Sequence, residues 1–302
     1  MKILLFGKNG QLGWELQRSL APVGELVALG SRETAMAADF LEPQTLADTV
    51  RQVRPDVIVN AAAYTAVDKA ETDRDAAHRV NAEAPGVLAR AAQACGALMV
   101  HYSTDYVFDG SGQTPWRESD APAPLNVYGA TKLEGERNVT QAGGCHLVFR
   151  TSWVYSARGG NFARTMLRLA QERERLSVVN DQFGAPTGAE LLADVTAHAI
   201  RATLARPELA GLYHLAASGE TTWHGYARHV LEFARARGLP LKADAGRVDP
   251  VASSAFQTAA RRPGNSRLDT QAVRAAFGLS LPDWRAGVER MLCEVLDSRQ
   301  AG

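Results

Sequence analysis

A tyrosine and a lysine stand four residues apart in the stretch NVYGATKLEGE, which runs from Asn126 to Glu136. Residues four apart lie on the same face of a helix, so Tyr128 and Lys132 can point at a common spot. Such a pair is frequent by chance, and taken alone it favours a solvated helix face on which the lysine stem covers the ring. The alternative is that Tyr128 and Lys132 form an acid–base pair. Evidence for that alternative must come from other parts of the sequence.

The acid–base alternative has definite chemistry. A free phenol has a pKa near ~10 and is therefore a sluggish proton donor or acceptor at neutral pH. A neighbouring ammonium favours the phenolate, so Lys132 is expected to move the pKa of Tyr128 toward the working pH.

Short apolar runs alternate with helical patterns through the first half of the chain, which predicts an α/β fold with a doubly wound parallel sheet. The runs cover residues 2–7, 26–29, 56–63, 98–104 and 146–155. No clean linker follows them, so the lobes are expected to interleave. We expect residues 1–155 to form mainly the sheet domain and residues 156–302 mainly a smaller lobe, with some segments returning to the sheet.

The stretch GKNGQLG places Gly7, Gly10 and Gly13 directly after the first predicted strand, at the start of a helix. Glycines there permit a tight turn, let backbone amides approach a pyrophosphate and allow close packing of helix on strand. The alternative is a turn without a ligand. The position at the start of an alternating chain favours a dinucleotide site.

Further landmarks follow in a set order. Asp39 and Phe40 come first, Asn60 to Ala63 end the third predicted strand, and Thr104 ends the fourth. With the glycines and the Tyr-x-x-x-Lys pair, the chain resembles the extended branch of the short-chain dehydrogenase/reductase superfamily. In that superfamily the first two segments lie along adenine and ribose, and a serine or threonine stands beside the catalytic tyrosine.

The octet STDYVFDG, residues 103–110, selects a branch of the superfamily. Nucleotide-sugar 4,6-dehydratases carry Asp-Glu after the serine or threonine, whereas here Tyr106 follows Asp105, so the elimination machinery is incomplete. The octet is similar to that of the dTDP-4-dehydrorhamnose reductases. The other segments similar to that family are RTSWVY (150–155), NFARTMLRLA (161–170), NDQFGAPTG (180–188) and RPGNSRL (262–268).

The resemblance implies reduction of dTDP-4-dehydro-L-rhamnose to dTDP-L-rhamnose by hydride from NAD(P)H, the last step of dTDP-rhamnose biosynthesis. Thr104 would polarise the substrate carbonyl, Tyr128 would deliver the proton, and Lys132 would bind the nicotinamide ribose. The cofactor-binding positions that the resemblance implies are Gly7, Asn9, Gly10, Gln11, Leu12, Gly13, Ser31, Arg32, Asp39, Phe40, Ala61, Ala62, Ala63, Thr65, Tyr102, Tyr128 and Lys132.

Substrate contacts are expected by the same resemblance at Thr104, Asp105 and Trp153. An indole suits a sugar face, although a core tryptophan at a strand end is the alternative. Arg262 and Arg267 of the RPGNSR loop have the fork geometry that suits a diphosphate, or else they are solvated loop residues.

The end of the second predicted strand bears on the choice of cofactor. NAD-selective proteins place a carboxylate there for the ribose 2′-hydroxyl. Here Gly30, Ser31 and Arg32 stand at the strand end, and Glu33, one step later, is expected to point away. We therefore expect NADPH to be preferred and NADH to be accepted. The alternative is a solvated Arg32 with equal use of both cofactors.

Two further expectations follow from relatives. Some reductases bind Mg²⁺ at a dimer contact through glutamates that correspond to Glu15, Glu190 and Glu294, so Mg²⁺ and a homodimer are expectations here. Scattered helix carboxylates are more often solvated charges. The regulatory β subunit of methionine adenosyltransferase also resembles this family, so a nucleotide-binding partner protein is an alternative function, as is another nucleotide-sugar reductase or epimerase.

Composition excludes several classes of partner. Basic and acidic residues both total 33, which gives no reason to expect nucleic acid or an anionic membrane. Cys95, Cys145 and Cys293 form no C-x-x-C pair, and the seven histidines show no zinc spacing. No apolar run approaches a signal sequence or a membrane span, so we expect a cytoplasmic protein.

Overall fold

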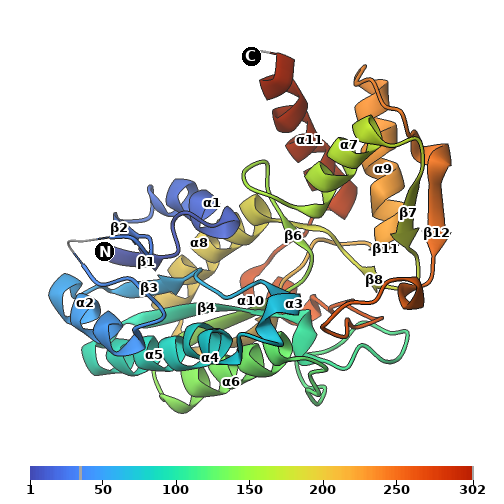
Figure 1. The fold of residues 1–302 in the computed structure, drawn as a ribbon. Helices are drawn as coiled ribbons and strands as arrows, with labels where there is room; N and C mark the ends of the chain where they lie inside the picture. Colours follow the sequence, from blue (N-terminus) through green and yellow to red (C-terminus); the bar gives the residue numbers. More distant parts are fainter. Residues whose placement is uncertain (34–35, 301–302) are drawn as a thin grey trace.

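A six-stranded parallel sheet forms the centre of the computed structural model, which describes residues 1–33 and 36–300 (Figure 1). Every neighbouring pair of strands is parallel, and the order is β10-β5-β4-β3-β1-β2. The expected doubly wound α/β fold is confirmed. Its strands are β1 (Lys2–Phe6), β2 (Glu25–Leu29), β3 (Val57–Asn60), β4 (Leu98–Thr104), β5 (His146–Thr151) and β10 (Gly211–His214).

Helices cover both faces of this sheet because its strands are apolar on both sides. Alternate residues of β1 enter different cores: Ile3 and Leu5 pack in one, Leu4 and Phe6 in the other. The first core includes residues of α1 (Gln11–Leu20), α8 (Ala189–Ala205) and α10 (Gln271–Phe277). The second includes residues of α2 (Leu46–Val53) and α5 (Ala84–Cys95), with α6 (Val127–Gln141) beside α5.

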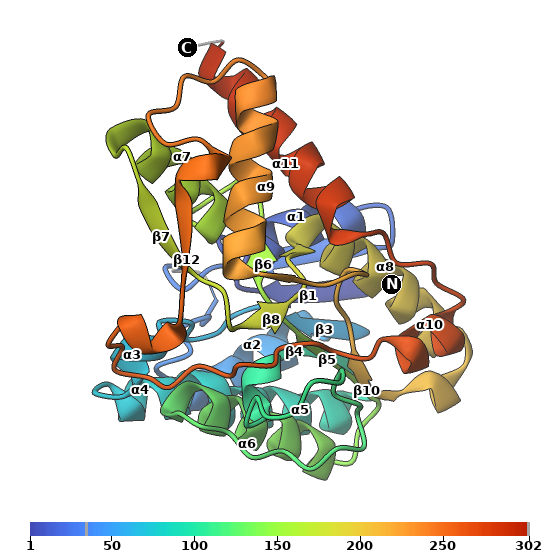
Figure 2. The same cartoon turned by 90° about the vertical axis from the view of Figure 1, so that its right-hand side faces the viewer.

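A smaller lobe stands above the carboxyl ends of the strands (Figure 2). Its core joins α7 (Phe162–Glu172), α9 (Trp223–Ala236) and α11 (Trp284–Gln300) to the parallel pair β7 (Leu176–Val179) and β12 (Val248–Val251). The remaining elements are short: α3 (Val67–Ala70), α4 (Arg74–His78), β6 (Val154–Tyr155), β8 (Phe183–Gly184), β9 (Thr187–Gly188) and β11 (Thr221–Thr222).

The chain crosses between the two parts more than once. After α7 and β7 it returns to pack α8 beside α1, and β10 extends the large sheet next to β5. It then enters the small lobe again through α9 and β12, before α10 packs under the sheet. Loops from both parts therefore meet at the carboxyl edge of the sheet.

Two predicted strands are shorter than expected. The run 56–63 stays extended only to Asn60, and the run 146–155 breaks after Thr151 before β6 begins. Trp153 lies in the break with φ 49°, a left-handed conformation that a non-glycine residue rarely adopts. After both strands the chain leaves the sheet at its carboxyl edge.

Within the described parts of the chain, no helix combines the length and the apolarity of a membrane span. Cys95, Cys145 and Cys293 are all free thiols, as the sequence predicted.

Candidate active site

The glycine turn after β1 is shaped by close backbone approach. Gly7 has φ +88°, and a Cβ there would lie 2.7 Å from the amide nitrogen of Ala62. A Cβ on Gly13 would overlap the carbonyl oxygen of Gly7. These two positions therefore exclude any other residue, because one needs a left-handed backbone and the other lets α1 pack against the turn.

Gly10, the N-cap of the same helix, has a different role. A Cβ there would meet only the Gly7 carbonyl oxygen, at 3.5 Å, so the space beside it is largely open. No side chain caps α1, and its first amides come from Gln11, Leu12 and Gly13. Uncapped amides at a helix N-terminus beside open space fit a pyrophosphate.

The loop after β3 closes the other side of this turn. Ala61 and Ala62 lie against Gly7, and the Ala62 amide donates to Asn60 Oδ1 at 3.0 Å. Phe40 is buried, with its ring 5.6 Å from that of Phe6. The loop residues Asp39, Ala63 and Thr65 are exposed at the same edge of the sheet.

Thr104, Tyr128 and Lys132 converge at the end of β4. Thr104 is the last residue of this strand, and α6 starts nearby because Asn126 caps it, accepting from the Gly129 amide at 2.8 Å. The Thr104 hydroxyl is a neighbour of the Tyr128 phenol and acts to lower its pKa. One turn further along α6, Lys132 Nζ donates to the carbonyl oxygen of Tyr102 at 2.6 Å.

The electrostatics of this trio differ from the sequence expectation. Burial raises the pKa of Tyr128 to about 12, and the neighbouring Thr104 offsets only part of that effect. Burial lowers the pKa of Lys132 to about 8, against the opposing charge of Glu136. The expected lowering of the Tyr128 pKa is therefore wrong, because burial of the phenol is the dominant effect. The Lys132 ammonium is bonded to the Tyr102 carbonyl instead.

Asp105 lies beside the trio and is fully buried. Its Oδ1 accepts from the Thr104 hydroxyl at 3.1 Å, and burial raises its pKa to about 6, although the neighbouring Ser266 and Thr104 act to lower that pKa. The next residue, Tyr106, sets its ring edge-on to Tyr128, with 5.4 Å between centroids. An acidic group and two phenols thus lie together at the end of β4.

A cavity of about 1390 Å³ opens between the large sheet and the small lobe. Tyr106 lines it at the end nearest the trio, and Phe162 and Trp223 line it on the small lobe. Arg261 and Arg262 line it from the segment before α10. Arg262 also forms a bidentate pair with Asp68, at 3.2 and 2.6 Å. The cavity therefore combines aromatic walls with fixed positive charge.

This constellation has close counterparts among known proteins. The family model described as RmlD substrate binding domain matches residues 1–296. Two curated proteins named dTDP-4-dehydrorhamnose reductase, from Escherichia coli K12 and Burkholderia thailandensis, are 58% and 52% identical to the chain. The first alignment covers 98% of each chain, and the second covers 95% of this chain and 97% of the relative. The chain belongs to the dTDP-4-dehydrorhamnose reductase family.

Solved structures agree with this assignment. A dTDP-4-dehydrorhamnose reductase from Bacillus anthracis, solved in complex with NADP, superposes with a TM-score of 0.87 at 35% identity and covers 97% of this chain and 99% of its own. One from Clostridium acetobutylicum gives 0.87 at 33%, with 99% and 100% covered. A UDP-glucose 4-epimerase from Thermus thermophilus, at 18% identity and a TM-score of 0.77, shares the fold.

In this reductase family member, Arg262 is the one expected substrate residue among those that line the cavity, and Thr104, Asp105, Trp153 and Arg267 are not among them. Trp153 stacks on Trp223 with centroids 3.7 Å apart, and Trp223 is the residue that lines the cavity. Arg267 is ion-paired with Glu220 at 2.6 Å and packs over the Phe183 ring. Both roles stay predictions, since a bound ligand could change these contacts.

Sequence reasoning missed Trp223 and Arg261. Arg261 directly precedes Arg262 in the printed sequence, and that adjacency is a usable signal. Trp223 follows Thr222, which caps α9 by accepting from the Gly225 amide at 3.0 Å. The capping pattern locates the helix, but nothing local shows that its first residue faces a cavity.

Tyr102 is placed differently from the expectation of a side-chain contact with the cofactor. Its hydroxyl is 2.7 Å from Thr196 Oγ1 of α8, in the core on the α1 side of the sheet. Because strand residues alternate between faces, this side chain points away from Lys132. A contact from Tyr102 to a cofactor would therefore come from its main chain.

Glu33 does not point away from the end of β2, and that expectation is wrong. Its carboxylate is ion-paired with Lys8 and accepts from the Gly30 amide at 3.4 Å. The ion pair with the ammonium of Lys8, in the glycine turn, orients the Glu33 carboxylate toward the end of β2. Ser31 and Arg32 are exposed beside it.

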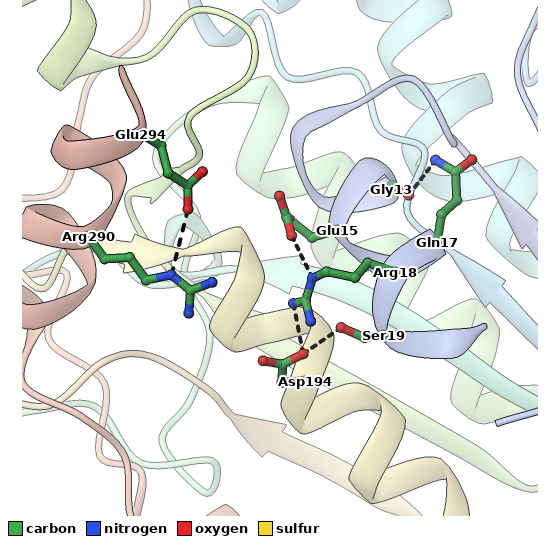
Figure 3. Close-up of polar contacts among 8 residues, drawn as sticks. All are labelled: Gly13, Glu15, Gln17, Arg18, Ser19, Asp194, Arg290 and Glu294. Atoms are coloured by element: carbon green, nitrogen blue, oxygen red, sulfur yellow. Dashed lines mark hydrogen bonds and ion pairs between the residues drawn. The ribbon is translucent and has the colours of Figure 1, made fainter. Parts of the chain in front are cut away.

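The expected magnesium site is not supported. Glu15 lies 3.2 Å from Arg18 Nε, and Glu294 lies 3.6 Å from Arg290 Nε (Figure 3). Burial raises the pKa of Glu190, and the charge of Glu15 adds to that effect. Across residues 1–33 and 36–300, no three potential ligand side chains are grouped as a metal would need. Two of the three carboxylates are satisfied by arginines instead.

Proposed function

We propose that this protein reduces dTDP-4-dehydro-L-rhamnose to dTDP-L-rhamnose with NADPH. The observation that carries the proposal is the convergence of Thr104, Tyr128 and Lys132 at the end of β4, beside Tyr106, which lines a large cavity. The relatives named as dTDP-4-dehydrorhamnose reductases, aligned over almost the whole chain, support the choice of substrate. The same relatives favour a reductase over a regulatory nucleotide-binding subunit.

Different segments of the chain would bind different parts of the cofactor. The open amides at the start of α1 would hold the pyrophosphate, with the loop after β3 along the adjoining ribose. Lys132, once turned from the Tyr102 carbonyl, would bind the nicotinamide ribose. The bound nicotinamide supplies the hydride.

The protein's own part in the chemistry is to hold and deliver a proton. The raised pKa of Tyr128 keeps its phenol neutral, which is the form that a proton donor needs. Thr104, once its hydroxyl has turned from Asp105, would donate a hydrogen bond to the substrate carbonyl and stabilise the negative charge that develops on its oxygen. Tyr128 then transfers its proton to that oxygen.

The cavity walls fit a nucleotide sugar. Arg261 and Arg262 supply positive charge for a diphosphate. The ion pair with Asp68 holds the guanidinium of Arg262 in one orientation. Phe162 and Trp223 offer flat apolar surfaces to a base or a sugar. We assign Thr104 and Asp105 to the sugar end of the substrate, next to the proton donor.

A direct assay tests the proposal. The protein is incubated with dTDP-4-dehydro-L-rhamnose and NADPH carrying deuterium at the nicotinamide, and products are followed by mass spectrometry. We expect the substrate to gain two hydrogens, one of them deuterium from the cofactor. With dTDP-glucose we expect no loss of water, because Tyr106 occupies the position of the dehydratase glutamate. NADPH binding without turnover would overturn the proposal and favour a regulatory role.

Arg32 is expected to favour NADPH. Its guanidinium is exposed at the end of β2, while Glu33 is engaged by Lys8. Arg32→Ala should lower the ratio of kcat/KM for NADPH to that for NADH by up to about fivefold, since an exposed pair contributes ~0–1 kcal/mol. Arg206→Ala, which removes an exposed arginine after α8, serves as control. Unchanged ratios in both variants at fixed ionic strength would contradict the assignment.

A further inference from the structure

The buried side of Lys132 faces a histidine that the proposed mechanism does not use. His101 of β4 is fully buried, and its Nε2 lies 3.5 Å from Lys132 Nζ. Gly135 of α6 lies beside it: a Cβ there would overlap the Asn81 carbonyl oxygen and would be in van der Waals contact with His101 Nε2, at 3.6 Å. The imidazole is therefore packed directly under the lysine.

The tautomer of His101 follows from its hydrogen bonds. The Ala62 amide can only donate, so the atom of Asn60 that it contacts at 3.0 Å is the carbonyl oxygen. The amide nitrogen of Asn60 then faces His101 Nδ1, at 3.2 Å. Because Asn60 donates there, Nδ1 must be the unprotonated nitrogen. A neutral His101 thus carries its proton on Nε2, which faces Lys132.

The ammonium of Lys132 therefore faces another hydrogen-bond donor, the Nε2–H group of His101. An ammonium has three protons and no lone pair, so it forms no hydrogen bond with an N–H group. One of its protons goes to the Tyr102 carbonyl at 2.6 Å. The others are left for partners on the side of Lys132 away from His101.

We propose that His101, held as the Nε2–H tautomer by Asn60, is a positioning residue that keeps the ammonium of Lys132 directed toward the active site. An acceptor at the same place would draw the ammonium into the core and away from the cofactor side. This inference rests on the proposed reductase function for its catalytic meaning, but the tautomer itself is independent of that function.

The charged neighbours of Lys132 are few. On α6, Glu136 favours its charged form, and Glu136 is itself paired with Arg150 of β5 at 2.9 and 2.7 Å. On β4, His101 is neutral, because burial first and the charge of Lys132 second lower its pKa well below the usual range. The field at Lys132 is therefore set by Glu136 and by the dipole of His101.

Nuclear magnetic resonance of wild-type protein labelled with ¹⁵N-histidine tests the tautomer without any mutation. The two-bond couplings between the ring carbons' protons and the ring nitrogens identify which nitrogen carries the proton, and the His101 signals are those missing from His101→Leu. We expect protonation at Nε2. Protonation at Nδ1, or at both nitrogens, at pH 7 would overturn the proposal, even if the protein proves to be an active reductase.

A pH profile tests the effect on catalysis. Wild-type kcat/KM should fall as pH rises through about 8, where Lys132 loses its proton. His101→Leu removes the facing N–H group, so its alkaline limb should move up by about one pH unit. His198→Leu removes an imidazole on α8 that is hydrogen-bonded to the Phe277 carbonyl at 2.9 Å, and it should leave the limb in place. An unmoved limb in His101→Leu overturns the proposal, whereas a wild type without turnover refutes the reductase function instead.

Discussion

Tyr128→Phe is expected to lower kcat by ~10²–10⁴-fold, the usual contribution of general acid catalysis. The substitution keeps the ring and its edge-on contact with Tyr106, and it removes only the hydroxyl, which is a neighbour of Thr104. Cofactor affinity should change little, because the ring still fills the same space. Steady-state kinetics with NADPH and a separate measurement of NADPH binding check both statements.

Tyr213→Phe is a matched control for this experiment. It also removes a tyrosine hydroxyl, one that donates to the Leu209 carbonyl at 2.9 Å, on β10 at the edge of the sheet. Its kcat should stay near the wild-type value. If Tyr128→Phe retained most of the wild-type turnover, Tyr128 would not be the proton donor and Asp105 would become the candidate.

The sequence predicts that Thr104, Tyr128 and Lys132 come together, because the signals for that arrangement are local. The spacing of Tyr128 and Lys132 matches one helical turn, and Asn126 caps that helix so that Tyr128 lies in its first turn. Thr104 ends a strand whose bounds, 98–104, were predicted correctly. Parallel strands end at one edge of a sheet, so the order of elements alone brings the trio and the glycine turn together.

The sequence does not predict contacts that depend on distant partners. The orientation of Glu33 is decided by Lys8, and that of Arg267 by Glu220 and Phe183. The pKa of Tyr128 was expected to fall, but burial raises it, and burial depends on how the two lobes pack around the site. Trp223 likewise becomes a cavity residue only when α9 is placed against β7 and the segment before α10.

The greatest expected loss of stability comes from breaking the ion pair beneath the catalytic helix. Arg150 forks onto Glu136 at 2.9 and 2.7 Å, and both side chains are 4% exposed. Glu136→Gln leaves a buried guanidinium without its counter-charge, which typically costs ~3–5 kcal/mol. We expect a fall of that size in the free energy of unfolding, measured by urea denaturation.

Two comparisons separate this effect from the loss of a charge in general. Glu172→Gln breaks the exposed pair with Arg168 on α7, where the side chains are 52% and 58% exposed, and should cost no more than ~0.5 kcal/mol. In the double variant Glu136→Leu with Arg150→Met, no buried charge is left unpaired, so much of the stability lost in Glu136→Gln should return. If Glu136→Gln were as stable as Glu172→Gln, the pair would not be buried in solution, and α6 would be held to β5 by its apolar contacts alone.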